Sequence, residues 1–264
     1  MPTIFDYEFM RYAFIAAGLV SIMASSVGYF LVIRGQSFAG HALSHVGFTG
    51  ATGALIVGLS PITGMIVATL TTGLAMGALG EKLAGRDIAI GVVLSLALGL
   101  GLLFSKFVNG SILPLSALLF GNILSVDSST LTTLVVLFFT SLIALAVIAR
   151  PLLFATMQPE LAEAKGVHLR GLSALFLCIV SLAVAASAQV VGALLVFSLL
   201  IAPAATAINL TRRISFSLFL SMALALCQSW FGILIAFYTD WPVSFCITLL
   251  GSFFFALSFF RRAN

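Results

Sequence analysis

Charged side chains are scarce in this sequence: Asp, Glu, Lys and Arg make up 8% of its 264 residues, whereas 61% are hydrophobic. Soluble domains carry about 25% charged residues, so this scarcity excludes a soluble protein and indicates a polytopic membrane protein. Little room remains for an attached soluble domain, and we expect residues 1–264 to form a single transmembrane domain. The net charge of +4 comes from single or paired basic residues between apolar runs, which excludes a nucleic-acid-binding surface.

Sequence motifs for several chemistries are also absent. No G-x-x-x-x-G-K-[ST] segment occurs, which excludes ATP binding through a P-loop. No H-E-x-x-H motif occurs either, because Ala42 stands where the glutamate base would be. The three cysteines, Cys178, Cys227 and Cys246, lie scattered in apolar segments. Their odd number and scatter argue against a disulfide framework or a metal cluster, and we interpret them as packing residues.

Apolar segments of about 20 residues, the length that crosses a bilayer as a helix, recur along the chain. The sequence therefore predicts an all-α bundle of about eight to nine transmembrane helices, and nine fit near 12–33, 38–59, 61–80, 88–108, 131–149, 172–190, 191–210, 214–237 and 243–260. The uncharged stretch 172–210 would be about 60 Å long as one helix, so we expect it to fold back between Ser187 and Gly192. Polar residues, glycines and a proline between 109 and 128 flank an apolar run at 115–120, which predicts a short or re-entrant helix.

Lysine and arginine indicate the orientation, because cytoplasmic loops are enriched in them. With nine helices and an external N-terminus, ten of the twelve basic residues fall inside, and only Arg11 and Lys106 fall outside. Close helix packing is indicated by Gly73 and Gly77, a GxxxG pair that lets transmembrane backbones approach each other.

Two histidines, His41 and His45, lie four residues apart in the predicted helix 38–59. This spacing places both imidazoles on one helical face, and two nitrogen ligands make half of a zinc-type site. Polar groups at membrane depth are costly and mark ion pathways, so we predict that the pair contacts a metal ion. The alternative is a pair of hydrogen-bonded structural residues between helices. Ser44 is a candidate partner of the imidazoles.

The sequence offers no third strong ligand at this depth, because none of the eight Asp and Glu residues lies in the middle of a predicted helix. Two completions remain open. A second copy of the chain gives four imidazoles across a twofold axis, or water and weak ligands complete the shell. An incomplete shell suits transport, since a passing ion must leave as well as enter.

The longest predicted inside loop contains a short helix with signals at both ends. Proline suits the first helical position, acids the first turn, lysine the last turn and glycine the position after it. The residues of this segment are Pro159, Glu160, Leu161, Glu163, Lys165 and Gly166. The helix either joins two spans as a plain surface helix or docks a cytoplasmic partner.

Gly192 and Pro203 interrupt the apolar segment 191–210. A proline inside a membrane helix frees a backbone carbonyl and allows a kink. The two residues are therefore candidates for a gate, with tight helix packing as the alternative.

Taken in order, these segments resemble the permease subunits of bacterial zinc and manganese ABC transporters, the ABC-3 family. The resemblance is carried by residues 32–34, 40–46, 119–124, 159–162, 166–167, 191–195 and 201–207. These segments are distributed over nearly the whole chain, and no single one of these motifs would be enough to indicate the family.

The resemblance implies a non-catalytic permease of the bacterial inner membrane that imports metal by alternating access at a homodimer interface. It also implies cytoplasmic ATP-binding subunits, which move the helix at 159–166, and an extracytoplasmic metal-binding protein. His41 and His45 match metal-handling positions of the family. Many members have an acid where His41 stands, and imidazole shifts the preference from hard Mn²⁺ toward Zn²⁺. We therefore expect Zn²⁺ as the transported ion, with Mn²⁺ as the alternative and no resident cofactor.

Two other classes of function stay open. A stand-alone secondary metal transporter or channel would need coupling acids at membrane depth, and the sequence places none there. A membrane-embedded metal-dependent enzyme would need a general base beside the histidines, which Ala42 does not supply.

Overall fold

The computed structural model describes residues 7–78, 86–108 and 115–262, and this part of the chain consists of helices and their connections without a strand. The predicted all-α class is therefore confirmed. In chain order the elements are α1 (Glu8–Ile33), α2 (Ser37–Ile56), α3 (Pro61–Ala78), α4 (Arg86–Phe107), α5 (Leu115–Phe120), the 3-10 helix η2 (Ile123–Ser125), α6 (Ser128–Met157), α7 (Pro159–Ala164), α8 (Leu169–Val191), α9 (Ala193–Leu210), α10 (Ile214–Thr239) and α11 (Val243–Arg262). The polar flank at 109–114 and the predicted end of helix 61–80 lie outside the described residues.

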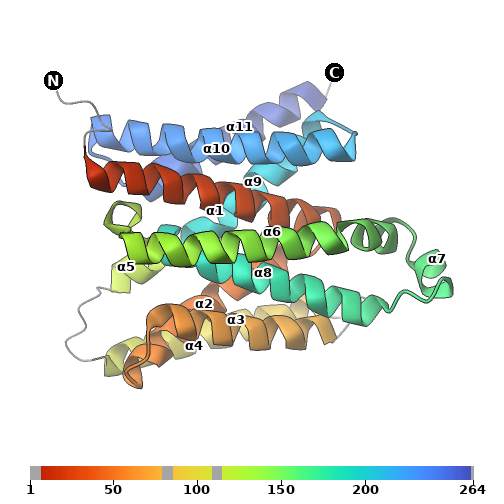
Figure 1. Ribbon diagram of the computed structural model, residues 1–264, viewed down its shortest axis with the longest axis horizontal. Helices are drawn as coiled ribbons and strands as arrows, with labels where there is room; N and C mark the ends of the chain where they lie inside the picture. The colour runs from red at the N-terminus through yellow and green to blue at the C-terminus, as the bar shows by residue number, and fades with distance from the viewer. Residues whose placement is uncertain (1–6, 79–85, 109–114, 263–264) are drawn as a thin grey trace.

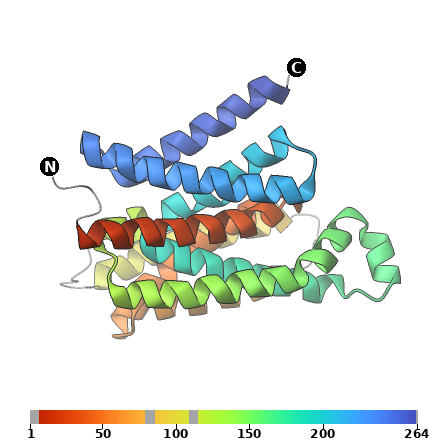
Figure 2. The same ribbon diagram turned by 45° about the horizontal axis from the view of Figure 1, so that its top comes forward.

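The long helices lie side by side in one bundle (Figure 1). Helix α1 begins at one end of the bundle, and α7 protrudes from the opposite end, as both views show (Figures 1 and 2). An external N-terminus together with an internal 159–166 helix requires this placement at opposite ends.

Eight helices of the described part are long and apolar enough to cross a membrane: α1, α3, α4, α6, α8, α9, α10 and α11. The remaining long helix, α2, has 20 residues but is not among the eight, because glycine, serine, threonine and two histidines make it less apolar. The prediction of about eight to nine spans is confirmed, with α2 as a polar helix that packs against α3, α4, α8 and α9.

Glycines bring the backbones of α2, α3 and α8 together. Gly50 of α2 and Gly64 of α3 lie so close that a Cβ atom on either would overlap the other's carbonyl. A Cβ atom on Gly73 or Gly77 would likewise overlap α8, the second at Ala174. The close packing predicted from the GxxxG pair is confirmed.

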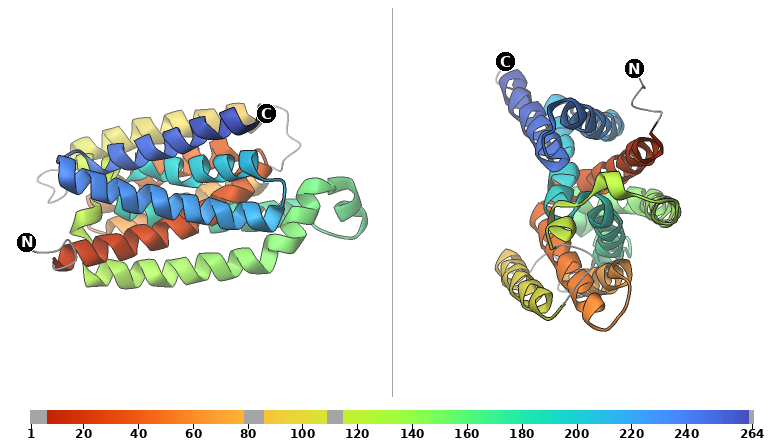
Figure 3. Two further views of the ribbon diagram at one scale, coloured as in Figure 1. Left: turned by 90° about the horizontal axis from the view of Figure 1, so that it is seen from above. Right: turned by 90° about the vertical axis from the view of Figure 1, so that its left-hand side faces the viewer.

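Helix α6 differs most from its prediction. The predicted helix 131–149 stopped before Arg150, whereas α6 continues to Met157 and contains Pro151. Arg150 is exposed, so its charge needs no partner within the bundle. The helix can therefore continue through this residue. Proline costs one hydrogen bond and bends a helix, and α6 changes direction near its end (Figures 2 and 3). This extension carries α7 beyond the bundle.

Two smaller predictions are also confirmed. Helix α8 ends at Val191 and α9 begins at Ala193, so the chain folds back at Gly192, within the predicted interval. The apolar run at 115–120 forms the short helix α5.

Candidate functional site

The two imidazoles of α2 lie against each other. Their ring centroids are 4.8 Å apart and their planes are perpendicular. His45 is 4% exposed, and His41 is half-buried. The Nδ1 atom of each ring is buried and has no hydrogen-bond partner. Since an unpaired buried polar atom costs roughly 1–3 kcal/mol, both Nδ1 atoms are candidate donors to a bound ion.

An aromatic side chain of α9 covers the pair. The ring of Phe197 lies 4.7 Å from the ring of His41, centroid to centroid, and Phe38 of α2 lies 6.4 Å from it on another side. The Phe197 contact could not be predicted from the sequence, because this phenylalanine is one apolar residue among many in its segment. The two aromatic rings leave the imidazole nitrogens as the polar atoms on this side of the site.

Ser44 does not contact the imidazoles in the predicted way. Its hydroxyl donates to the backbone carbonyl of His41 at 2.7 Å, a bond within its own helix. The hydroxyl of Thr49 lies 3.1 Å from the carbonyl of His45 and also hydrogen-bonds the carbonyl of Ala97 on α4. Thr49 therefore ties the histidine-bearing turn of α2 to α4.

A third strong ligand is missing from the described residues, where no group of three or more His, Cys, Asp or Glu side chains could hold a metal ion. The incomplete ligand set therefore stays a prediction, in agreement with the described part of the chain. Two imidazoles can hold an ion only together with water or with groups from another molecule.

Helix α7 has the ends that proline and glycine predicted, whereas Lys165 lies at the C-cap and not in the last turn. Pro159 occupies the first turn, and Gly166, at φ 83°, ends the helix in the left-handed region. The amide of Val167 donates to the carbonyl of Ala162 at 3.0 Å, which closes the C-terminal turn in the Schellman manner. The small side chain of Ala162 is fully buried and anchors the helix.

The outer face of α7 is exposed and carries acids beside apolar side chains. Glu160 and Glu163 are exposed, and Leu161 is 46% exposed. An open depression of about 430 Å³ lies beside them, lined by Met157, Gln158, Pro159, Glu160 and Leu161. A protruding helix with an exposed leucine next to a depression has the features of a docking surface.

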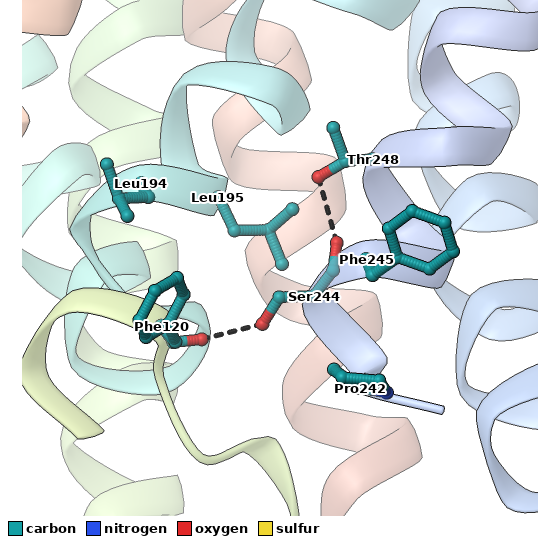
Figure 4. A pocket seen from close by; sticks show the side chains of 7 residues that line it. All are labelled: Phe120, Leu194, Leu195, Pro242, Ser244, Phe245 and Thr248. Atoms are coloured by element: carbon teal, nitrogen blue, oxygen red, sulfur yellow. Dashed lines mark hydrogen bonds between the residues drawn. The ribbon is translucent and has the colours of Figure 1, made fainter. Parts of the chain in front are cut away.

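Gly192 lies in a tight backbone contact at the other end of the bundle. A Cβ atom on Gly192 would overlap the backbone of Phe120 and Gly121. The hydroxyl of Ser244 on α11 donates to the carbonyl of Phe120 at 2.7 Å, so α5, α9 and α11 meet here (Figure 4). This geometry agrees with tight helix packing at Gly192, which was the alternative to a gate.

An apolar pocket of about 660 Å³ adjoins this contact (Figure 4) and is lined by Phe120, Leu194, Leu195, Pro242, Ser244, Phe245 and Thr248. The hydroxyls of Ser244 and Thr248, the polar side-chain groups of the pocket, both donate to backbone carbonyls. Pro203 lies elsewhere, buried inside α9, which continues unbroken from Ala193 to Leu210. The structure therefore does not bring Gly192 and Pro203 into one feature.

Known proteins resemble this chain over almost its whole length. The profile of the ABC 3 transport family matches residues 6–262. The chain is 32% identical to the manganese transport system membrane protein MntC of Halalkalibacterium halodurans, over 97% of this chain and 88% of that protein. It is 30% identical to the chelated iron transport system membrane protein YfeD of Yersinia pestis, over 96% of this chain and 86% of that protein.

Two solved structures have the same fold. PsaBC from Streptococcus pneumoniae in complex with Fab matches with a TM-score of 0.86 and 30% identity, over 97% of this chain and 92% of that chain. An inward-facing putative metal-chelate type ABC transporter matches with a TM-score of 0.74 over 96% of this chain and 86% of that chain. At 17% identity the second match concerns the fold alone.

The Gly192 contact predicts a difference between two glycine substitutions. Gly192→Ala and Gly166→Ala both place alanine at positive φ, 81° and 83°, which costs about 1–3 kcal/mol of backbone strain at each. Only Gly192→Ala adds a steric overlap, because nothing lies within 4 Å of a Cβ atom on Gly166, and overpacking costs about 1–3 kcal/mol more. Thermal unfolding of the purified variants in detergent measures the difference. Equal losses for both variants would contradict the close contact at Gly192.

Proposed function

The chain belongs to the ABC 3 transport family, and from this premise we propose that it is the permease subunit of an ATP-driven importer of a divalent metal ion. It is a multi-pass protein of the bacterial inner membrane, with eight apolar helices in its described part. Like the related permeases, it is a non-catalytic membrane component. The observation that carries the metal assignment is the pair of buried, unpartnered Nδ1 atoms on His41 and His45.

The donor atoms favour Zn²⁺ as the transported ion. Imidazole suits borderline ions such as Zn²⁺, whereas Mn²⁺ prefers carboxylate, carbonyl and water oxygens. Mn²⁺ is the second candidate, because MntC is named for manganese transport. Another relative, YfeD, is named for the transport of chelated iron. The ion is cargo and has no permanent place in the protein.

We propose that a second copy of the chain completes the pathway. Two imidazoles leave an ion with an incomplete shell, and a facing copy would raise the number to four. In the end-on view of Figure 3, α2 and α9 form the side of the bundle between α4 and α11, and His41 and Phe197 come from these two helices. Alternating access at this face would expose the histidine pair first to one side of the membrane and then to the other.

ATP-binding subunits are proposed to dock on α7. The chain has no P-loop, so the energy must come from another subunit. Helix α7 protrudes from the end of the bundle opposite to the start of α1 (Figure 1) and presents Leu161 and two acids. A metal-binding protein would deliver the ion at the other end.

The two other classes of function lose their support. Family membership disfavours a stand-alone transporter or channel, since members work within ABC assemblies. An enzyme is excluded by the non-catalytic role of the related permeases, in agreement with Ala42 at the position of a general base.

Removing the histidine pair should strongly lower metal uptake. We expect His41→Ala with His45→Ala to lower uptake by the assembled importer by about tenfold or more, because changes around metal ligands cost 10–100-fold. Uptake of radioactive Zn²⁺ and Mn²⁺ by cells measures this. His168→Ala, which removes an exposed imidazole before α8, is the matched control. Undiminished accumulation at normal protein levels would contradict a metal role for the pair.

Replacing His41 with a carboxylate should change the preferred ion. In His41→Asp we expect the ratio of Zn²⁺ to Mn²⁺ uptake to fall by roughly tenfold, because a hard oxygen donor replaces imidazole. Uptake from an equimolar mixture of the two ions gives the ratio directly. A wild-type protein that prefers Mn²⁺, or a ratio that does not respond to the substitution, contradicts the assignment of zinc.

Docking on α7 predicts that a charge at Leu161 separates the subunits. We expect Leu161→Glu to weaken retention of the ATP-binding subunits by about tenfold or more, because docking would bury the exposed leucine and a glutamate would oppose this burial. Co-purification of the subunits from membranes measures retention. Leu124→Glu is the control, since Leu124 is 37% exposed on η2, away from α7. Equal retention by both variants would show that α7 is a plain surface helix.

A further inference from the structure

A tight turn connects α1 to the histidine-bearing helix. Arg34 ends α1, and its amide donates to the carbonyl of Phe30 at 3.0 Å. Gly35 has a φ of 65°, and the amide of Gln36 donates to the carbonyl of Leu31 at 2.8 Å. Helix α2 begins at the next residue. A displacement of Arg34 therefore passes directly into the first turns of α2, where His41 lies.

The Arg34 side chain reaches two other helices at this point. Its Nη1 atom donates to the hydroxyl oxygen of Thr156 on α6 at 3.0 Å, and its guanidinium lies 5.5 Å from the ring centre of Phe176 on α8. The Thr156 hydroxyl in turn donates to the carbonyl of Leu152 at 2.7 Å, so its oxygen is held as an acceptor for Arg34. The Phe176 ring is fully buried and therefore fixed in position.

These two partners flank α7 in the sequence. Thr156 stands two residues before Gln158, which caps α7, and α8 with Phe176 follows α7. Arg34 thus contacts both helices that carry α7. It is partly buried, whereas the other basic side chains described at this end are exposed: Arg150, Lys165, Arg170, Arg212 and Arg213.

We propose that Arg34 is the positioning residue that couples movement of α7 to the histidine pair on α2, an inference that rests on the proposed import function. When ATP-binding subunits displace α7, the ends of α6 and α8 move with it. The guanidinium passes this movement to the turn at Gly35 and on to α2. Arginine suits this task because its planar fork donates a hydrogen bond in its plane and stacks on an aromatic ring through its face.

The test compares metal uptake with ATP hydrolysis in the same proteoliposomes, using the permease assembled with its ATP-binding subunits. We expect Arg34→Gln and Thr156→Val to lower the amount of metal moved per ATP hydrolysed by about tenfold, the scale of one hydrogen bond to a charged group. ATP hydrolysis itself should stay within about twofold of wild type, because neither Arg34 nor Thr156 lies on α7, where the ATP-binding subunits are proposed to dock. Thr156→Ser, which keeps the hydroxyl, should restore the wild-type ratio.

Matched controls separate coupling from charge and from stability. Arg150→Gln removes an exposed arginine of α6. Thr140→Val removes an exposed hydroxyl of α6 that, like Thr156, bonds to its own helix. Both should keep the wild-type ratio.

Wild-type ratios in Arg34→Gln and Thr156→Val would overturn the coupling role while leaving import intact. A proportional fall of uptake and hydrolysis would show a merely structural role and also overturn it. A wild-type assembly that hydrolyses ATP without moving Zn²⁺, Mn²⁺ or Fe²⁺ would contradict the import function, and the coupling role with it.

Discussion

Hydrocarbon offers no hydrogen-bond partner, so a helix with two imidazoles can lie at membrane depth only if protein encloses it. Helix α2 meets this condition through its contacts with α3, α4, α8 and α9. Glycines make the enclosure possible, since side chains at Gly50 or Gly64 would separate α2 from α3. The apolar helices around it can face lipid because they carry few polar groups. The arrangement of the bundle thus depends on keeping one polar helix away from lipid.

Much of the fold could be predicted because hydropathy and helix-end signals are local properties of a sequence. The apolar runs located the crossing helices, and proline and glycine located the ends of α7. The length of α6 could not be predicted in this way. Arg150 and Pro151 are common at helix ends, and whether a helix continues through them depends on access to water beyond the bundle, which only the tertiary structure sets.

The histidine site was predicted in part. Spacing alone placed His41 and His45 on one face, and the absence of acids predicted that the ligand set is incomplete. The cover by Phe197 could not be predicted, because His41 and Phe197 lie more than 150 residues apart in the chain. The interpretation of Ser44 failed for a different reason: a serine in a helix can bond to its own backbone, and spacing does not distinguish this from a bond to an imidazole.

We propose above that the transported ion passes between the imidazoles of His41 and His45. X-ray absorption at the zinc edge, on the assembled transporter loaded with one equivalent of Zn²⁺, tests it most directly. We expect a first shell that includes imidazole nitrogens at about 2.0–2.1 Å, with the multiple scattering of the rings. A first shell of oxygen atoms alone, without imidazole, would contradict it.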